Sequence, residues 1–180
     1  MGDLWVYVLA IAGAIAVAVA AAFLGRALYV RQVRRSLVRL LGSREAVTAA
    51  AKGVERVIRH LVNDDEALAA FASDAGSEDR RAVEDVAARM RIVADDLRVT
   101  PLPKRLWPVA DDMERAARGL ADQAGRVGEA TSPDEALDAL GGIDMGEVRA
   151  SVALVNERLE PMLEAFHVDD PAVYGGGLYI

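Results

Sequence analysis

An uncharged N-terminal run places the tightest limit on how this chain folds. None of the 22 residues from Leu4 to Gly25 carries a charge. As an α-helix the run spans about 33 Å, which exceeds the hydrocarbon core of a bilayer at roughly 30 Å. We therefore predict a transmembrane anchor over residues 1–30. A cleaved signal peptide is the competing interpretation, but only Asp3, and no Lys or Arg, precedes the run.

Positive charge follows the run and does not precede it. Residues 26–44 carry six arginines and no acid, so the positive-inside rule predicts an inner-membrane, single-pass protein with its N terminus outside and its C-terminal part in the cytoplasm. The basic juxtamembrane segment 31–43 either orients the anchor or also recognises anionic lipid, since both need the same arginines. The residues expected at the membrane interface are Trp5, Arg26, Arg31, Arg34 and Arg35.

Small residues recur at every fourth position within the anchor, at Ala10, Ala14, Ala18 and Ala22. Such a ridge lets two membrane helices approach closely, which suggests a homodimer. Alanine is so frequent in this run that a ridge at some spacing also arises by chance. Both interpretations stay open.

A seven-residue repeat of apolar residues begins beside the bilayer and continues outward. Its first row is Val33, Leu40, Val47, Val54, Leu61 and Leu68. Gly42 and Gly53 each weaken a helix by about 1 kcal/mol relative to alanine, so this helix is either continuous with the anchor or interrupted near Gly42-Ser43. Continuity favours transmission of a signal along the helix, whereas a break favours a simple tether.

Three further segments carry apolar residues at alternating spacings of three and four, as amphipathic helices do. They cover residues 83–97, 109–127 and 148–166. Ser132 and Asp144 stand where helix N-caps belong, with a glutamate three residues later in each case. Four apolar faces are buried together when helices pack at shallow angles. We therefore predict an all-α chain in which an antiparallel four-helix-bundle-like cytoplasmic domain covers 44–167 and a flexible tail covers 168–180.

The charge of the remaining chain limits its partners. Residues 45–180 hold 27 acidic against 15 basic side chains, a net charge of −12, which repels nucleic acid. Aromatic residues make up only 5% of the chain, which disfavours stacking on single-stranded bases. The absence of cysteine rules out disulfides and thiolate metal sites. We expect the lipid bilayer and a protein as partners, and no nucleic acid.

No constellation of residues predicts catalysis. Glu164-x-x-His167 is one half of the motif that di-metal helical bundles use, and the second half is missing. The acidic pairs lack the alternating ligands and fixed glycine of an EF-hand. Phosphate-binding loops and nucleophile elbows do not occur. We expect no enzyme activity, no cofactor and no metal site.

Two features suggest protein binding. Trp107, in the proline-rich segment 101–108, either anchors a partner or covers the end of the core. The tail after a triple glycine ends in an apolar cluster that suits capture as a peptide or packs back onto the domain. The candidate tail residues are Tyr174, Leu178, Tyr179 and Ile180.

These patterns lead to two functional hypotheses. The leading one is a non-enzymatic, membrane-tethered helical adaptor or scaffold that recruits a cytoplasmic partner through its tail or its domain. The alternative is a signal-transducing module that relays a change of state through the helix that follows the anchor. No motif in the chain identifies a family.

Overall fold

The computed structural model describes residues 2–168, with side chains from residue 15 onward. All regular structure in this range is helical, which confirms the predicted all-α class. The longest helix is α1, Gly2–Asn63. The other elements are α2 (Asp65–Ser73), α3 (Glu78–Val99), the short 3-10 helix η1 (Lys104–Leu106), α4 (Trp107–Gly128), α5 (Pro133–Gly141) and α6 (Met145–Phe166).

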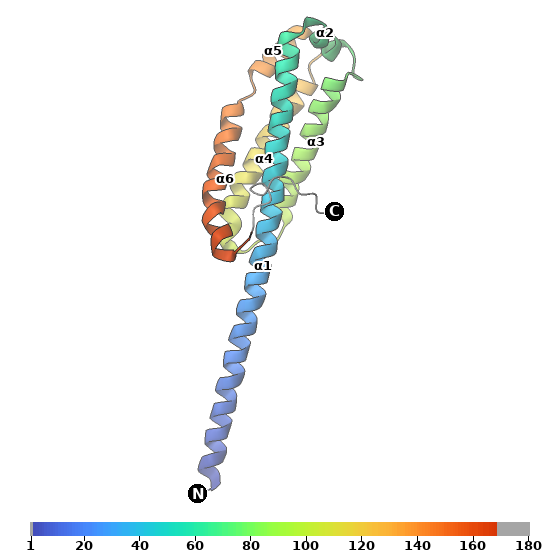
Figure 1. Ribbon diagram of the computed structural model, residues 1–180. Coiled ribbons are helices and arrows are strands. Elements are labelled where there is room, and N and C mark those ends of the chain that lie inside the picture. Colours follow the sequence, from blue (N-terminus) through green and yellow to red (C-terminus); the bar gives the residue numbers. More distant parts are fainter. Residues whose placement is uncertain (1, 169–180) are drawn as a thin grey trace.

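Helix α1 lies in two different environments. Its N-terminal half projects from the other helices as a stalk (Figure 1) and exposes large apolar side chains such as Phe23, Leu24 and Leu28. By length and composition this helix is able to cross a membrane, as the sequence predicts. From Val33, which is 2% exposed, the same helix enters the core of the helical domain.

The structure has no break at Gly42-Ser43, where the sequence left two alternatives open. Helix α1 continues through both residues. Leu40 and Leu41 before them and Val47 after them are buried, so tertiary packing holds both sides. Burial of each such side chain contributes about 1.5–3 kcal/mol, which outweighs the roughly 1 kcal/mol that one helical glycine costs.

The long helices share one apolar core. Helix α3 packs most extensively on α4, α4 packs on α6, and α1 packs on both α3 and α6. Helices α3 and α6 run back toward the stalk, whereas α1 and α4 run away from it (Figure 1). The whole first row of the seven-residue repeat is buried, namely Val33, Leu40, Val47, Val54, Leu61 and Leu68.

The repeat nevertheless crosses a helix boundary that its spacing does not reveal. Helix α1 ends at Asn63, and Leu68 belongs to α2. The carboxylate of Asp64 accepts hydrogen bonds from the backbone N–H groups of Glu66 and Ala67, both at 3.0 Å. These bonds satisfy donors that the first turn of a helix leaves free, so a new helix starts here.

The predicted N-caps of the last two helices are confirmed. Ser132 Oγ accepts a hydrogen bond from the backbone N–H of Glu135 at 3.3 Å, and Asp144 Oδ1 accepts one from that of Glu147 at 2.9 Å. Hydrogen bonds from the backbone N–H and the hydroxyl of Thr131, with a further one from the backbone N–H at Ser132, lower the pKa of the Glu135 carboxyl. The link between α4 and α5 is thus held by local polar contacts.

The core also extends into the segment 31–43, which the sequence sets apart as a basic juxtamembrane segment. One face of that segment carries the arginines, and the opposite face packs against the other helices. The buried apolar residues of the segment are Val33, Leu37, Leu40 and Leu41. The helical domain therefore needs this part of α1 to complete its core.

Candidate functional site

A groove runs along the surface between α1 and α3. It consists of two cavities of about 570 and 390 Å³. Both are lined by Gly53, Ala82 and Val86, so the two cavities adjoin along the helices. We call it the α1–α3 groove.

Small side chains on α1 leave room for this groove. Ala46, Ala49, Ala50 and Gly53 line it from α1, and the buried Met90 lines it from α3. A methyl group added at Gly53 would reach ordinary contact distance, 3.9 Å, from Val86 Cγ2. An apolar groove between two helices is the kind of surface that accepts the apolar face of a third helix.

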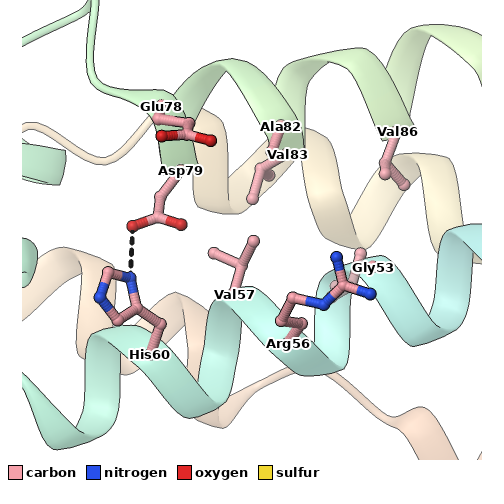
Figure 2. A pocket seen from close by; sticks show the side chains of 10 residues that line it. Gly53, Arg56, Val57, His60, Glu78, Asp79, Ala82, Val83 and Val86 are labelled. Atoms are coloured by element: carbon pink, nitrogen blue, oxygen red, sulfur yellow. Dashed lines mark hydrogen bonds and ion pairs between the residues drawn. The ribbon is translucent and has the colours of Figure 1, made fainter.

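His60 and Asp79 lie at the end of the groove that is furthest from the stalk. Figure 2 shows His60 and Val57 on α1 facing Asp79 and Val83 on α3. His60 Nδ1 lies 2.8 Å from Asp79 Oδ2, and His60 Nε2 lies 3.9 Å from Asp64 Oδ2. The described residues that line this end include no serine, threonine, cysteine or lysine for the imidazole to activate. The pair joins α1 to the first turn of α3.

The arginines expected at the membrane interface divide into two groups. Arg34 Nε donates a hydrogen bond to the main-chain oxygen of Phe166 at 2.7 Å. Arg26, Arg31 and Arg35 are exposed and make no hydrogen bond or ion pair with another described residue. Arg31 and Arg35 line a cavity of about 270 Å³ at the stalk end of the domain, which we call the membrane-proximal pocket.

Trp107 is exposed rather than buried in the core. Its side chain is 52% exposed, and Leu106, at 1%, takes the core position instead. The indole Nε1 donates a hydrogen bond to the main-chain oxygen of Leu102 at 2.9 Å. An exposed indole is what a partner anchor requires, and the role of Trp107 in partner binding stays a prediction.

Five of the predicted interaction residues lie beyond what the structure describes. Trp5 belongs to α1, but its side chain is outside the described set. The tail candidates Tyr174, Leu178, Tyr179 and Ile180 are outside it as well. Their roles stay predictions.

Sequence reasoning missed an ion pair at the contact between α4 and α6. Asp112 is only 6% exposed, and its carboxylate pairs with Arg158 of α6 and with Arg115 Nη1 at 3.2 Å. The signal was present, because an acid at position 112 falls within the apolar face that Val109, Met113 and Ala116 form. A carboxylate placed there needs a cation from a neighbouring helix.

Comparisons with known proteins add no family to this picture. No protein-family model, curated protein or solved structure matches the chain.

Proposed function

We propose that this chain is a non-enzymatic, single-pass membrane protein whose helix α1 relays a change of state between the bilayer and the helical domain. The observation that supports this most is the unbroken course of α1 through Gly42-Ser43. A rigid helix that belongs to both parts transmits a tilt or rotation of the anchor to its contacts with α3 and α6. A passive tether has no need of this continuity, so the alternative hypothesis from the sequence becomes the preferred one.

The proposal includes a membrane arrangement. The apolar half of α1 crosses the inner membrane, the N terminus lies outside, and the helical domain lies in the cytoplasm. The six arginines after the apolar run support this orientation. The domain is an antiparallel four-helix bundle of α1, α3, α4 and α6, which the core that these helices share supports.

The α1–α3 groove is the surface that such a relay would change. Helix α1 forms one wall of the groove and packs on α3 less extensively than α4 does. A displacement of α1 alters the width of the groove while the α3–α4 contact persists. A partner helix bound in the groove would therefore respond to the state of the anchor.

Spin labels across the groove test the relay. The chain has no native cysteine, so Ala49→Cys with Ala82→Cys places labels only on the two walls. Bilayers of different thickness tilt the anchor to different degrees. The full-length protein in short-chain and long-chain lipid bilayers is expected to show label distances that differ by about 1–2 Å, the usual size of helix shifts.

Two insertions after Leu28 supply the control. A flexible Gly-Ser linker disconnects the anchor from the domain, so the label distance should lose its dependence on bilayer thickness. A helical insertion of seven residues restores the helix phase to within about 20° and should keep it. A distance that is the same in all bilayers, or that still shifts with the flexible linker, would contradict the relay.

A reporter tests the orientation separately. A reporter that is active only outside the cytoplasm is expected to be silent when fused after Ile180, because the arginines hold that side in the cytoplasm. Activity of this fusion would overturn the orientation.

The second candidate is the adaptor or scaffold. The exposed Trp107 and the α1–α3 groove favour it, because both are suited to bind a protein. Recruitment by an adaptor should survive the flexible linker after Leu28, whereas the relay should not. Pull-down with the full-length chain and with the linker variant separates the adaptor from the relay. Pull-down with a chain that ends at Asp170 separates groove binding from tail binding.

A homodimer through the anchor is part of either candidate, and Ala18→Leu should weaken it.

A further inference from the structure

The chain leaves α6 beside the arginines of α1. Arg34 Nε donates a hydrogen bond to the main-chain oxygen of Phe166, close to the last described residue, Val168. Val168 itself packs against the main apolar core. Residues 169–180 follow from this point, at the stalk end of the domain (Figure 1). The point of departure limits which surfaces the C-terminal segment can reach.

Exposed arginines lead from this point across the outer face of α1. Successive residues of an α-helix are turned by about 100°, so Arg31 and Arg35 follow Arg34 around the helix in the direction away from α6. Arg39 comes next, on the side of α3, and all three line the membrane-proximal pocket opposite Pro101. None of the three makes a hydrogen bond or ion pair with another described residue. Their mutual repulsion favours a negatively charged segment along this path.

Hollows continue from these arginines toward the α1–α3 groove. A cavity of about 430 Å³ is lined by Arg39 and Ser43 of α1 and by Asp96 of α3. The larger cavity of the groove begins at Ala46, about one helical turn beyond Ser43. The α3 side of α1 is therefore basic near the stalk and apolar further out.

The groove exposes apolar surface that the described residues leave uncovered. Ile92, which is 61% exposed, and the half-buried Val86 and Val93 line it from α3. Its charged residues Asp85 and Arg89 form an ion pair at 3.6 Å, so their charges cancel. An occupant of this part needs apolar side chains rather than a matching charge.

The C-terminal segment carries the complementary properties in the same order. Its first two residues, Asp169 and Asp170, are acidic, and no basic residue occurs in 169–180. Apolar side chains follow at 173–174 and, after the triple glycine, at 178–180. An acidic start meets the basic part of α1, and the apolar residues then meet the apolar groove.

The length of the segment is sufficient for this path. Ala46 lies about 18 Å further out along α1 than Arg34. Passage around half of a helix that is about 10–12 Å wide adds about 16–19 Å. An extended chain of this length spans about 40–43 Å, so residues 178–180 reach the larger cavity of the groove. The far end of the groove, at His60, lies about 21 Å beyond Ala46 and stays out of reach.

A second copy of the chain fits this surface less well. In the proposed membrane arrangement, two copies stand at the same height above the bilayer. A second α1 laid along this side would bring its own arginines against Arg31, Arg35 and Arg39, and like charges repel. The acidic C-terminal segment of the same chain meets no such repulsion.

We propose that residues 169–180 fold back across α1 and dock in the α1–α3 groove. The acidic pair 169–170 lies on the arginines of the membrane-proximal pocket, and residues 178–180 cover the cavity lined by Ala46, Ala49 and Ala50. The segment then competes with the partner helix that the proposed function places in the groove, and the groove opens only when the segment is displaced. This regulatory role rests on the proposed function.

Spin labels on the segment and beside the groove test the docking. Ala88 is exposed on α3 and lines none of the cavities described above, and Gly176 lies within the triple glycine. The full-length Ala88→Cys, Gly176→Cys protein, diluted with unlabelled chain in detergent, is expected to give one narrow distribution of label distances. A broad distribution would overturn the docking.

Variants of the apolar contact come in matched pairs. Leu178→Ser with Ile180→Ser should lower the ratio of docked to free segment by about tenfold or more, because two apolar side chains lose their burial. Ala49→Trp fills the groove and should lower it similarly. Ala150→Trp, on an exposed position of α6, should leave it unchanged. Equal effects of the two tryptophans would contradict the assignment to the groove.

Variants of charge test the path across α1. Arg31→Gln with Arg35→Gln and Arg39→Gln should lower the docked-to-free ratio at least about threefold, since each exposed pair contributes modestly. The matched control, with glutamine at the exposed positions 98, 104 and 105, removes equal charge elsewhere at this end and should change the ratio less than about twofold. Equal losses in the two triple variants would overturn the proposed path.

A mixture of singly labelled chains identifies the chain that the segment docks on. A chain with Ala88→Cys alone, mixed with a chain with Gly176→Cys alone, should give no narrow distribution. A narrow one would mean that the segment docks on a second copy, and would overturn docking within one chain. The relay is measured between labels at Ala49 and Ala82, so either proposal can fail while the other holds.

Discussion

Arg34 Nε donates a hydrogen bond to the main-chain oxygen of Phe166 at 2.7 Å, across 132 positions of sequence. Phe166 is the last residue of α6, and the last carbonyl groups of a helix have no partner within it. The guanidinium group satisfies one of them and interacts favourably with the negative end of the helix dipole. The stalk end of α1 is thereby joined to the end of the last helix.

Replacement of this arginine should destabilise the domain. Arg34→Ala is expected to lower the free energy of unfolding by about 1 kcal/mol, the usual contribution of one hydrogen bond. Arg35→Ala removes the same charge next to it but breaks no hydrogen bond or ion pair among the described residues, so it should have little effect. Denaturant unfolding of both variants in detergent measures the difference, and equal losses would contradict the role of Arg34.

The Asp112–Arg158 pair should show energetic coupling. Asp112→Ala and Arg158→Ala are each expected to cost about 1–2 kcal/mol, less than a fully buried pair, because the Arg158 side chain is partly exposed. The double variant should cost less than the sum of the two. The exposed pair of Arg149 and Glu55 is the control, and Arg149→Ala should change stability by less than about 1 kcal/mol. Additive losses at Asp112 and Arg158 would argue against the coupling.

Gly42 offers a test of the continuous α1. A methyl group at this exposed position meets no atom within 4 Å, so Gly42→Ala should raise the free energy of unfolding by about 0.5–1 kcal/mol. Gly42→Pro should lower it by about 3 kcal/mol or more, because proline removes a helical hydrogen bond. Thermal unfolding reports both changes. A neutral Gly42→Pro would mean that α1 is hinged in solution.

The Glu135 carboxylate should make stability depend on pH. Hydrogen bonds from Thr131, and a further one from the backbone N–H at Ser132, lower the pKa of Glu135 in the folded state. The stabilisation is therefore present above the ordinary pKa of a glutamate and is lost as the pH falls through the lowered value. Glu135→Gln should unfold at a lower temperature than the wild type at pH 7, and the difference should vanish in acid. A difference that does not depend on pH would refute this assignment.

The length of α1 that the domain needs can be tested by truncation. A chain that begins at Ser43 lacks Val33, Leu37, Leu40 and Leu41, whose burial contributes about 6–12 kcal/mol together. That is comparable with the whole stability of an ordinary domain, roughly 5–15 kcal/mol. A chain that begins at Arg31 should be soluble and should unfold cooperatively by circular dichroism, whereas the Ser43 chain should not. Equal cooperativity would show that this part of the core is dispensable.

Apolar periodicity was sufficient to predict most of the helical core. The row from Val33 to Leu68 is buried throughout, because spacing along a helix determines which side chains share a face. Spacing did not reveal the boundary at Asp64, since a capped turn can restart a helix while the next apolar residue still faces the core. Whether Leu106 or Trp107 occupies the core position at the start of α4 depends on how that helix enters the domain, which spacing also does not reveal.

The candidate sites were less predictable for a physical reason. The α1–α3 groove depends on the distance between two helices, and the contact of Arg34 with Phe166 depends on where two distant segments meet. Neither the distance between the helices nor the meeting point of the segments has a local signal in the sequence. The basic segment was recognised by its charge, but its division into Arg34, which binds α6, and Arg31 and Arg35, which line a pocket, required the packed structure.

Helix α1 belongs both to the stalk and to the core, and this affects how the protein folds during its synthesis. The ribosome synthesises α1 first, and α6, which packs against it, is complete only at Phe166. At 5–20 residues per second, the roughly one hundred residues from the end of α1 to the end of α6 take about 5–20 s to translate. During this interval the anchor is available for membrane insertion while the core face around Leu37 and Leu40 is still uncovered. In the proposed membrane arrangement, the domain therefore completes its folding at the bilayer surface.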